Sequence, residues 1–271
     1  MALLPSPGTA IGFYLLLWLV ILIVPFFMTL LRSIIADMQV FIGVAGLLQA
    51  ALMIFVLVVF AQHQGLDLGA TLGLRRVRFG VCVWASVGVI SVGMVGGVLL
   101  WPVIEAMPWL ISKELEFLVQ LSRFSAPVVY LFYALSLSVG PALSEELAFR
   151  GLILQGLRSG LGAVSAVVLS ALFFGVIHLD PLQGLGAFIT GLYLGYLTVR
   201  SGSIYPAIAA HGVNNLWATL EASMRQAFNP QLSPKEILLS AGYPWWAYGV
   251  AGIMLLVALY KLHRAGGEAE R

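Results

Sequence analysis

The sequence has few charged residues and only one cysteine. Of its 271 residues, 10% are Asp, Glu, Lys or Arg, whereas 61% are hydrophobic. Because a soluble domain carries roughly 25% charged residues, this composition excludes a water-soluble globular protein. The single Cys82 cannot form an internal disulfide and excludes a cluster of thiolate metal ligands. A net charge of only +2 gives no reason to expect a nucleic-acid partner.

Long apolar segments are what the sequence has in abundance. A helix that spans a bilayer needs about 20 mostly apolar residues. Eight segments approach or exceed that length, so we predict an all-α fold, a polytopic transmembrane bundle of about eight helices. The segments are Ile11–Leu31, Val40–Ala61, Phe79–Trp101, Ala126–Leu143, Gly162–Ile177, Leu182–Val199, Ser203–Leu220 and Tyr243–Tyr260.

The composition of these segments divides the chain into three parts. Residues 1–125 are predicted to form N-terminal membrane helices, followed by an amphipathic surface helix within Met107–Phe124. Residues 126–220 form a membrane core that is richer in polar and small residues. Residues 221–271 are predicted to contain an exposed loop over Arg225–Ser240 and a last membrane helix. Glycines such as Gly93 and Gly97 are interpreted as positions where helices pack closely.

The charges between the apolar segments predict an orientation. If the N-terminus lies inside and the chain crosses eight times, nine of the 14 Lys and Arg residues fall on the inner side. Cytoplasmic loops carry the excess of Lys and Arg. We therefore expect an integral, multi-pass protein of a bacterial plasma membrane with both termini in the cytoplasm.

Charged residues within the core segment are candidates for function. A charge at bilayer depth costs at least roughly 2.5–3.5 kcal/mol. On a helix, Glu146 and Arg150 are four residues apart and can form an ion pair. Glu145 lies about 100° away around the helix axis and stays available. Pro141 predicts that a new helical segment starts just before this motif. The alternative interpretation is a capped helix with a solvated carboxylate pair.

Two further polar clusters lie in the same core segment. Phe174 and His178 occur where an apolar segment ends, and a histidine there could equally be a capping or packing residue. His211 and Asn215 are four residues apart and share one helix face. Their alternative role is polar contact between membrane helices. Helix rise places all three clusters at overlapping depths, so a common intramembrane site is geometrically possible.

Together these residues resemble a known family. Glu145-Glu146-x-x-x-Arg150, Phe174-x-x-x-His178 and His211-x-x-x-Asn215 resemble the three motifs of the CAAX prenyl endopeptidase and bacteriocin-processing family of intramembrane proteases. The resemblance covers about 126–220 and implies an endopeptidase with a membrane-associated peptide or protein as substrate. It implies that Glu145 and His178 activate water, and that His211 and Asn215 stabilise the oxyanion. Glu146, Arg150 and Phe174 are expected to support them.

The chemistry of the residues agrees with this reading but leaves the metal open. Amide hydrolysis needs a base for water, a proton donor for the amine and donors for the oxyanion. Two histidines and a glutamate could also hold zinc with an open position. No His-Glu-x-x-His motif occurs, and the four polar groups can account for hydrolysis alone. We therefore predict a glutamate mechanism with no cofactor and no metal ligands, with zinc as the alternative.

The competing class is a membrane protein that does not catalyse. A transporter, or an immunity or scaffold protein that binds a partner peptide, would also have broken helices with intramembrane charges. Against this class, the sequence shows no pair of inverted halves. Its ionisable residues gather in one half, which favours a single chemical site.

Overall fold

The computed structural model describes residues 4–239 and 242–269 and is helical, with no strand among these residues. The π-helix η2 and the helices on both sides of it form one continuous helix over 127–161. The helices are α1 (Pro7–Arg32), α2 (Met38–His63), α3 (Leu68–Leu72), α4 (Phe79–Ala106), the 3₁₀-helix η1 (Pro108–Leu110), α5 (Lys113–Leu121), α6 (Pro127–Glu146), η2 (Leu147–Ile153), α7 (Leu154–Leu161), α8 (Ala163–Val176), α9 (Pro181–Ser201), α10 (Tyr205–Phe228), α11 (Pro234–Leu239) and α12 (Trp245–Ala269).

The predicted bundle is confirmed. Each of the eight apolar segments corresponds to a long helix, namely α1, α2, α4, α6, α8, α9, α10 and α12. Six helices of the described residues are long and apolar enough to cross a bilayer by length and composition. α8 is apolar but has only 14 residues, and α10 falls outside this group. The protein is therefore an integral, multi-pass membrane protein.

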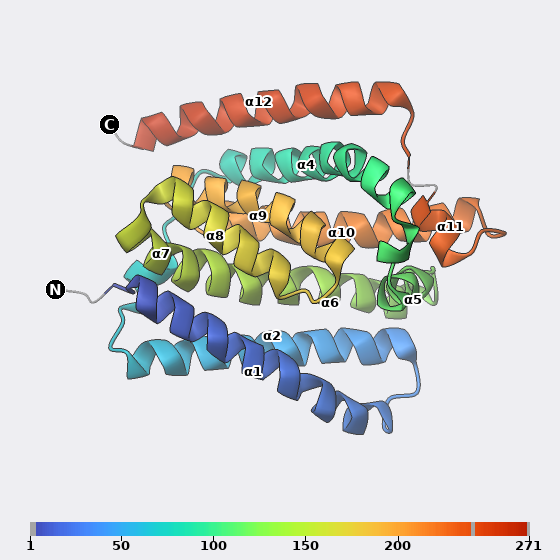
Figure 1. Ribbon diagram of the computed structural model, residues 1–271, viewed down its shortest axis with the longest axis horizontal. Helices are drawn as coiled ribbons and strands as arrows, with labels where there is room; N and C mark the ends of the chain where they lie inside the picture. Colours follow the sequence, from blue (N-terminus) through green and yellow to red (C-terminus); the bar gives the residue numbers. More distant parts are fainter. Residues whose placement is uncertain (1–3, 240–241, 270–271) are drawn as a thin grey trace.

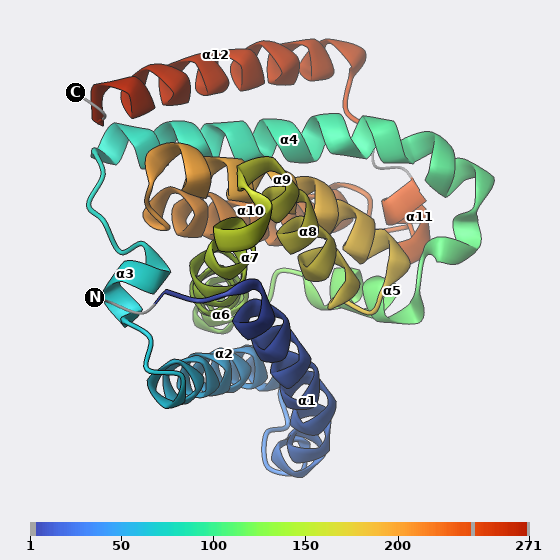
Figure 2. The ribbon, with the colours of Figure 1, turned by 60° about the vertical axis from the view of Figure 1, so that its left-hand side comes forward.

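The long helices run back and forth along one axis. Figure 1 shows that α1 begins and α12 ends at the same end of the bundle, here called the terminal end. In both ribbon views α1 and α2 lie on one side, α4 and α12 on the other, with α6 to α10 between them (Figures 1 and 2). Because the chain runs along this axis eight times, an even number, α1 begins and α12 ends at the same end.

Two hydrophobic clusters hold this arrangement together. One joins α1, α2, η2, α7 and α8 and includes Phe13, Leu57 and Phe149. The other joins α4, α9, α10 and α12 and includes Val89 and Leu194. Burying such a side chain contributes roughly 1.5–3 kcal/mol in water, and within a bilayer close van der Waals packing takes over that role. The buried polar residues described below lie between these clusters.

Close helix contact between α8 and α9 depends on two glycines. A Cβ added at Gly175 would lie 2.7 Å from the carbonyl oxygen of Gly184, and one added at Gly184 would lie 2.9 Å from the carbonyl oxygen of Gly175. Small residues of this kind allow membrane helices to approach closely. The contact places the end of α8 directly against the start of α9.

The connections at the end of the bundle opposite the terminal end differ in part from what the sequence predicted. The surface segment forms η1 and α5, with Ser112 accepting a hydrogen bond from the Leu115 amide as an N-cap. The segment expected as an exposed loop over 225–240 is partly helical. α10 continues to Phe228 and α11 follows, because Glu221 pairs with Arg225 at 2.6 Å and Ser233 caps the next turn.

Candidate active site

The acidic motif lies on one uninterrupted helix. α6 passes through Pro141, so the prediction that a new segment starts there is wrong. A proline lacks an N–H, and its position in a helix leaves the carbonyl four residues earlier without its helical donor. Here that carbonyl belongs to Leu137, and the side-chain amide of Asn215 lies 3.4 Å from it. A neighbouring helix thus contacts the carbonyl that Pro141 frees, as membrane helices commonly allow.

A π-helix follows the two glutamates directly. η2 occupies Leu147–Ile153 and all of its side chains from Ala148 to Ile153 are buried. π-Helical turns are rare and occur often at functional sites. This turn carries Arg150 into the interior of the bundle rather than toward either end, so Arg150 is not a loop residue.

Glu146 and Arg150 form the predicted ion pair. Arg150 Nη1 donates to Glu146 Oε1 at 2.8 Å, and the two side chains are 0% and 1% exposed for Glu146 and Arg150. Removing one member of such a buried pair typically costs about 3–5 kcal/mol. The pair therefore fixes this part of the site.

Arg150 is held by two further neighbours. Its Nη2 donates to the Gly191 carbonyl at 3.3 Å, and its guanidinium lies 4.4 Å from the ring centre of Phe174. A Cβ at Gly191 would lie 3.1 Å from Ala171 Cβ and 3.2 Å from Arg150 Nη2. Arg150 thus ties η2 to α8 and α9, and glycine at 191 leaves it room.

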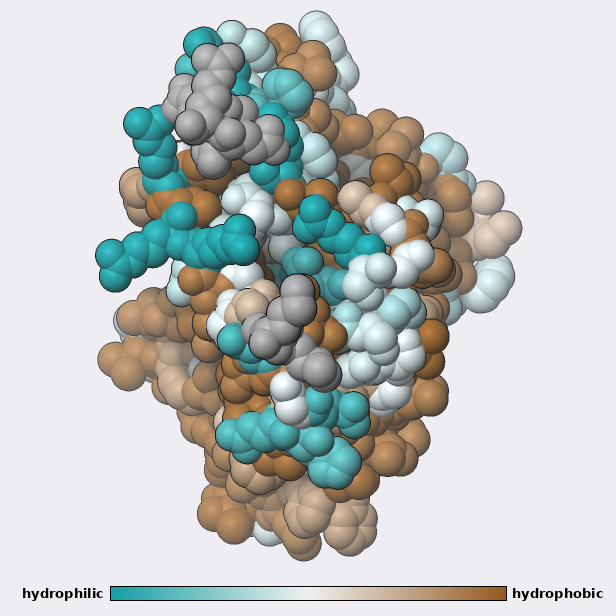
Figure 3. All heavy atoms as spheres, turned by 90° about the vertical axis from the view of Figure 1, so that its left-hand side faces the viewer, coloured by the Kyte–Doolittle hydropathy of each residue, from teal (hydrophilic) through white to brown (hydrophobic). Residues whose placement is uncertain are grey.

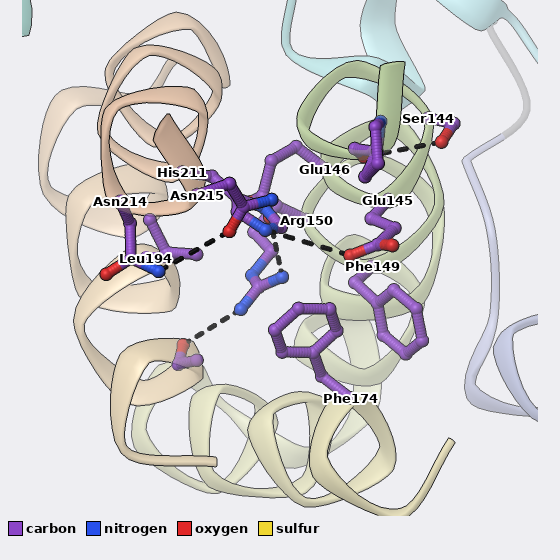
Figure 4. Close-up of polar contacts among 12 residues, drawn as sticks. Ser144, Glu145, Glu146, Phe149, Arg150, Phe174, Leu194, His211, Asn214 and Asn215 are labelled. Carbon is purple, nitrogen blue, oxygen red and sulfur yellow. Dashed lines mark hydrogen bonds and ion pairs between the residues drawn. The ribbon is translucent and has the colours of Figure 1, made fainter. Parts of the chain in front are cut away.

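His211 faces both glutamates. Its Nδ1 lies 2.8 Å from Glu146 Oε1, whereas its Nε2 lies 3.7 Å from Glu145 Oε2. Since an ionised carboxylate is only an acceptor, Nδ1 carries the hydrogen. The sequence placed His211 beside Asn215 and did not predict its contact with Glu146. Figure 4 shows His211 of α10 turned toward the glutamates of α6.

Phe174 separates the two histidines. Its ring meets His178 edge-on at 4.9 Å and His211 at 5.6 Å between ring centroids. His178 Nδ1 lies 2.7 Å from the Phe174 carbonyl oxygen, so Nδ1 donates and Nε2 stays available. No hydrogen bond or ion pair joins His178 to Glu145 in the part of the chain that the structure describes.

A tight turn positions His178 after the end of α8. Leu179 has φ +60° and is the only residue other than glycine with positive φ among those described. Left-handed backbone at a branched apolar residue is strained and often marks a functional site. Asp180 Oδ1 then accepts from the Gln183 amide at 2.7 Å, which makes Asp180 the N-cap of α9.

A cavity of about 430 Å³ lies between α4, α9 and α10, here called the site cavity. Its wall includes the polar candidates His178, His211 and Asn215. Gly93 and Gly97 of α4 also line it, whereas the sequence indicated only a packing role for them. A Cβ at Gly97 would meet no atom within 4 Å, so this face of α4 is open rather than packed.

Glu145 borders a different space. It lines a second cavity of about 250 Å³ together with Gln49, Pro141 and Ser144, between α2 and α6. Its side chain is 21% exposed, while its neighbour Glu146 is fully buried. Glu145 therefore stands between this cavity and His211.

Asn214 is a cavity residue that the sequence motifs did not single out. It lines the site cavity, and its Nδ2 lies 3.4 Å from Asn215 Oδ1. Figure 4 shows both side chains on α10 beside His211. Helical spacing alone separates the two asparagines by about 100°, so the spacing gave no signal that both would reach the cavity.

The candidate metal ligands do not converge. Among the described residues, no three His, Cys, Asp or Glu side chains are arranged to hold a metal ion. The arrangement that a zinc site with two histidines and a glutamate needs is therefore not formed by these residues.

The fold and the site define a class: a polytopic helical membrane protein with a buried cluster of acids, imidazole and guanidinium. Residues 127–217 match the family described as type II CAAX prenyl endopeptidase Rce1-like. This range contains all seven site residues named from the sequence. The match confirms the resemblance of this segment to the CAAX protease family. No curated protein and no solved structure matches the chain.

Proposed function

We propose that the protein hydrolyses a peptide bond of a membrane-associated substrate with a water molecule that Glu145 activates. The match of residues 127–217 to a CAAX protease family supports the reaction class, a peptidase acting at the membrane. The observation that carries the assignment to Glu145 is the unequal surroundings of the two adjacent glutamates. Glu146 is enclosed by Arg150 and His211, whereas Glu145 borders a cavity.

Glu145 is suited to act as the base. Glu146 Oε1 already accepts from Arg150 and from His211, at 2.8 Å each. Glu145 has only the 3.7 Å approach to His211, and the second cavity gives it space for water. Glu146 Oε2 has no hydrogen-bond partner but is buried, and Glu146 lines neither of the two cavities. A general base must be within hydrogen-bond reach of the proton it takes, and Glu145 is the acid that a water molecule in a cavity can reach.

His211 is proposed to carry both hydrogens and to donate from Nε2. Without a charge on His211, the buried cluster holds two carboxylates and one guanidinium. A protonated imidazole makes the total charge zero, and buried charges are tolerated when they are balanced and hydrogen-bonded. Glu146 would then orient His211, as a carboxylate behind a catalytic imidazole does. Nε2 would face the developing oxyanion.

Asn215 and His178 complete the proposed machinery from two other directions. Asn215 Nδ2 sits at the limit of hydrogen bonding to the Leu137 carbonyl, at 3.4 Å. A weakly held donor can turn to an oxyanion, which an amide can stabilise without moving a proton. His178 has its Nε2 available and is proposed to share the attacking water with Glu145 and to protonate the leaving amine.

The site cavity is proposed to hold the substrate. Its wall combines apolar side chains with the glycines of α4. Because glycine has no side chain, an extended peptide can lie close to the α4 backbone there. His211 and Asn215 form a polar part of the cavity wall. A substrate with a peptide segment at membrane depth fits this arrangement, whereas nucleic acid does not.

The experiment compares cells that produce the wild-type protein with cells that produce Glu145→Gln, and measures new peptide termini by proteomics. We expect a set of termini in membrane or lipid-anchored proteins that is present with wild type and missing with Glu145→Gln at equal protein level. Identical termini in both cell types would contradict the proposal. A carrier would instead show changed transport with no loss of cleavage products.

A further inference from the structure

A third cavity, with a different chemical character, lies at the terminal end of the bundle. It measures about 410 Å³ and shares no lining residue with the site cavity. Three arginines border it: Arg76 and Arg78 from the segment before α4, and Arg200 from α9. None of its lining residues in the described chain is acidic. Three guanidinium groups around one cavity favour an anionic occupant.

The segment that carries Arg76 and Arg78 is anchored rather than loose. The Gly73 carbonyl accepts from the Ile204 amide at 3.1 Å, and the Arg75 carbonyl accepts from Ser203 Oγ at 2.6 Å. Gly73 and Gly202 both have positive φ, 61° and 62°, which glycine adopts without strain. These contacts fix the segment beside the turn between α9 and α10, next to Arg200.

Arg200 has unused donor capacity in this cavity. Its Nη2 donates to the His263 carbonyl of α12 at 2.7 Å. Its Nε is buried and has no hydrogen-bond partner. A guanidinium has five N–H donors in a planar fork, and a buried donor without a partner costs free energy. An oxygen of a phosphate group in the cavity would accept from Nε.

Apart from Ser201 and Tyr196, the rest of the cavity lining is aliphatic. Val77, Val81 and Leu197 line it, together with Leu262 of α12. Figure 3 looks onto this end and shows hydrophilic residues gathered across the end face, with hydrophobic flanks around them. A site with arginines at the end face and aliphatic walls toward the flank matches a phospholipid, whose phosphate lies at the interface and whose chains lie deeper.

We propose that this cavity binds the phosphate of an anionic phospholipid, with Arg76, Arg78 and Arg200 around the phosphate and the acyl chains against α4 and α12. Free phosphate offers the same oxygens but no chains, and the aliphatic wall favours the lipid. Binding would tie α4, α9 and α12 together at the terminal end, so the lipid should stabilise the full-length protein.

The test uses the full-length protein purified in an uncharged detergent. Phosphatidylglycerol, phosphatidylcholine or inorganic phosphate is added, and bound lipid and melting temperature are measured. We expect phosphatidylglycerol to be retained at least about tenfold more than phosphatidylcholine and to raise the melting temperature, since Lys and Arg side chains near the membrane surface attract anionic headgroups. Phosphate that raises the melting temperature as much as phosphatidylglycerol would overturn the lipid assignment.

The cavity variant is Arg76→Gln with Arg200→Gln, and its control is Arg158→Gln with Lys261→Gln. The control removes the same charge at the same end from exposed residues outside the cavity. We expect the cavity variant to lose the preference for phosphatidylglycerol and the control to keep it. Equal retention by both would overturn the proposal. If the double variant does not fold, Arg76→Gln alone, at an exposed side chain, gives the same comparison.

Discussion

Glu145 and Glu146 are neighbours in the sequence with opposite surroundings in the structure. Glu146 is enclosed and joins Arg150 to His211, whereas Glu145 is partly exposed and borders a cavity. Two identical carboxyl groups can therefore take different roles, one positioning the imidazole and one acting on water. What separates the two roles is access to water, which Glu145 has and the buried Glu146 lacks.

The oxyanion assignment predicts a partial loss of activity for Asn215→Ala. Removing one oxyanion donor slows turnover by about 10²–10³-fold while the base is intact. Asn214→Ala removes a neighbour of Asn215 that only contacts it at 3.4 Å, so we expect less than about a tenfold loss. Cleavage of an identified substrate by purified protein measures both. A silent Asn215→Ala with a strongly damaging Asn214→Ala would contradict the assignment.

A metal-free mechanism predicts that cleavage survives chelation. The proposed base, proton donor and oxyanion donors are all side chains of this chain, so no step needs a bound ion. Active purified protein should contain zinc well below one ion per chain, and its turnover should be unchanged after chelation. Elemental analysis beside activity is the measurement. Stoichiometric zinc whose removal and return switches turnover off and on would favour the metallopeptidase alternative.

At the scale of the elements, one long helix and its contacts assemble the site. The spacing of Glu146 and Arg150 predicted their ion pair, because i and i+4 share a helix face in any helical stretch. The spacing could not predict that the helix continues through Pro141, since that depends on neighbouring helices in the bundle. It also could not predict the contact of His211 with Glu146, which joins residues 65 positions apart. The spacing of residues in the sequence predicts which of them share a helix face. Packing between helices determines which faces contact one another.

The crowded contact at Gly191 predicts a loss of stability for Gly191→Ala. The new Cβ would lie 3.1 Å from Ala171 Cβ and 3.2 Å from Arg150 Nη2, and such overpacking typically costs about 1–3 kcal/mol. Gly186→Ala on the same helix is the control, because a Cβ there meets no atom within 4 Å. Thermal unfolding in detergent measures both. Equal unfolding temperatures for the two variants would mean that α9 does not hold Arg150 as described.

At the scale of the whole molecule, eight segments predicted from apolar length appear as eight long helices. What composition could not give is the arrangement that places α4 and α12 on one side and α1 and α2 on the other. Nor did it give the continuation of α10 to Phe228, which depends on the ion pair of Glu221 with Arg225. The length of an apolar segment indicates whether it can span a bilayer. The arrangement of the helices and the end of α10 depend instead on contacts between individual residues.

The arrangement predicts that both termini face the cytoplasm. α1 begins and α12 ends at the terminal end (Figure 1), where hydrophilic residues gather (Figure 3) and where Arg76, Arg78 and Arg200 border a cavity. Lys and Arg are enriched in cytoplasmic loops. A cysteine introduced at Ser33, between α1 and α2, should react with a membrane-impermeant thiol reagent added to intact cells. One introduced at Ser159 should react only after lysis, with Cys82 replaced by alanine in both. The reverse labelling pattern would contradict the predicted orientation and place both termini outside the cell.

The central claim is that Glu145 acts on water while Glu146 holds the site together. The most direct measurement compares turnover and unfolding temperature for purified wild type, Glu145→Gln and Glu146→Gln. Glu145→Gln should lose all detectable cleavage and unfold like wild type. Glu146→Gln should unfold at a clearly lower temperature, because leaving Arg150 buried without its partner costs about 3–5 kcal/mol. If Glu145→Gln cleaves at the wild-type rate, or if the two variants lose activity and stability equally, the account is contradicted.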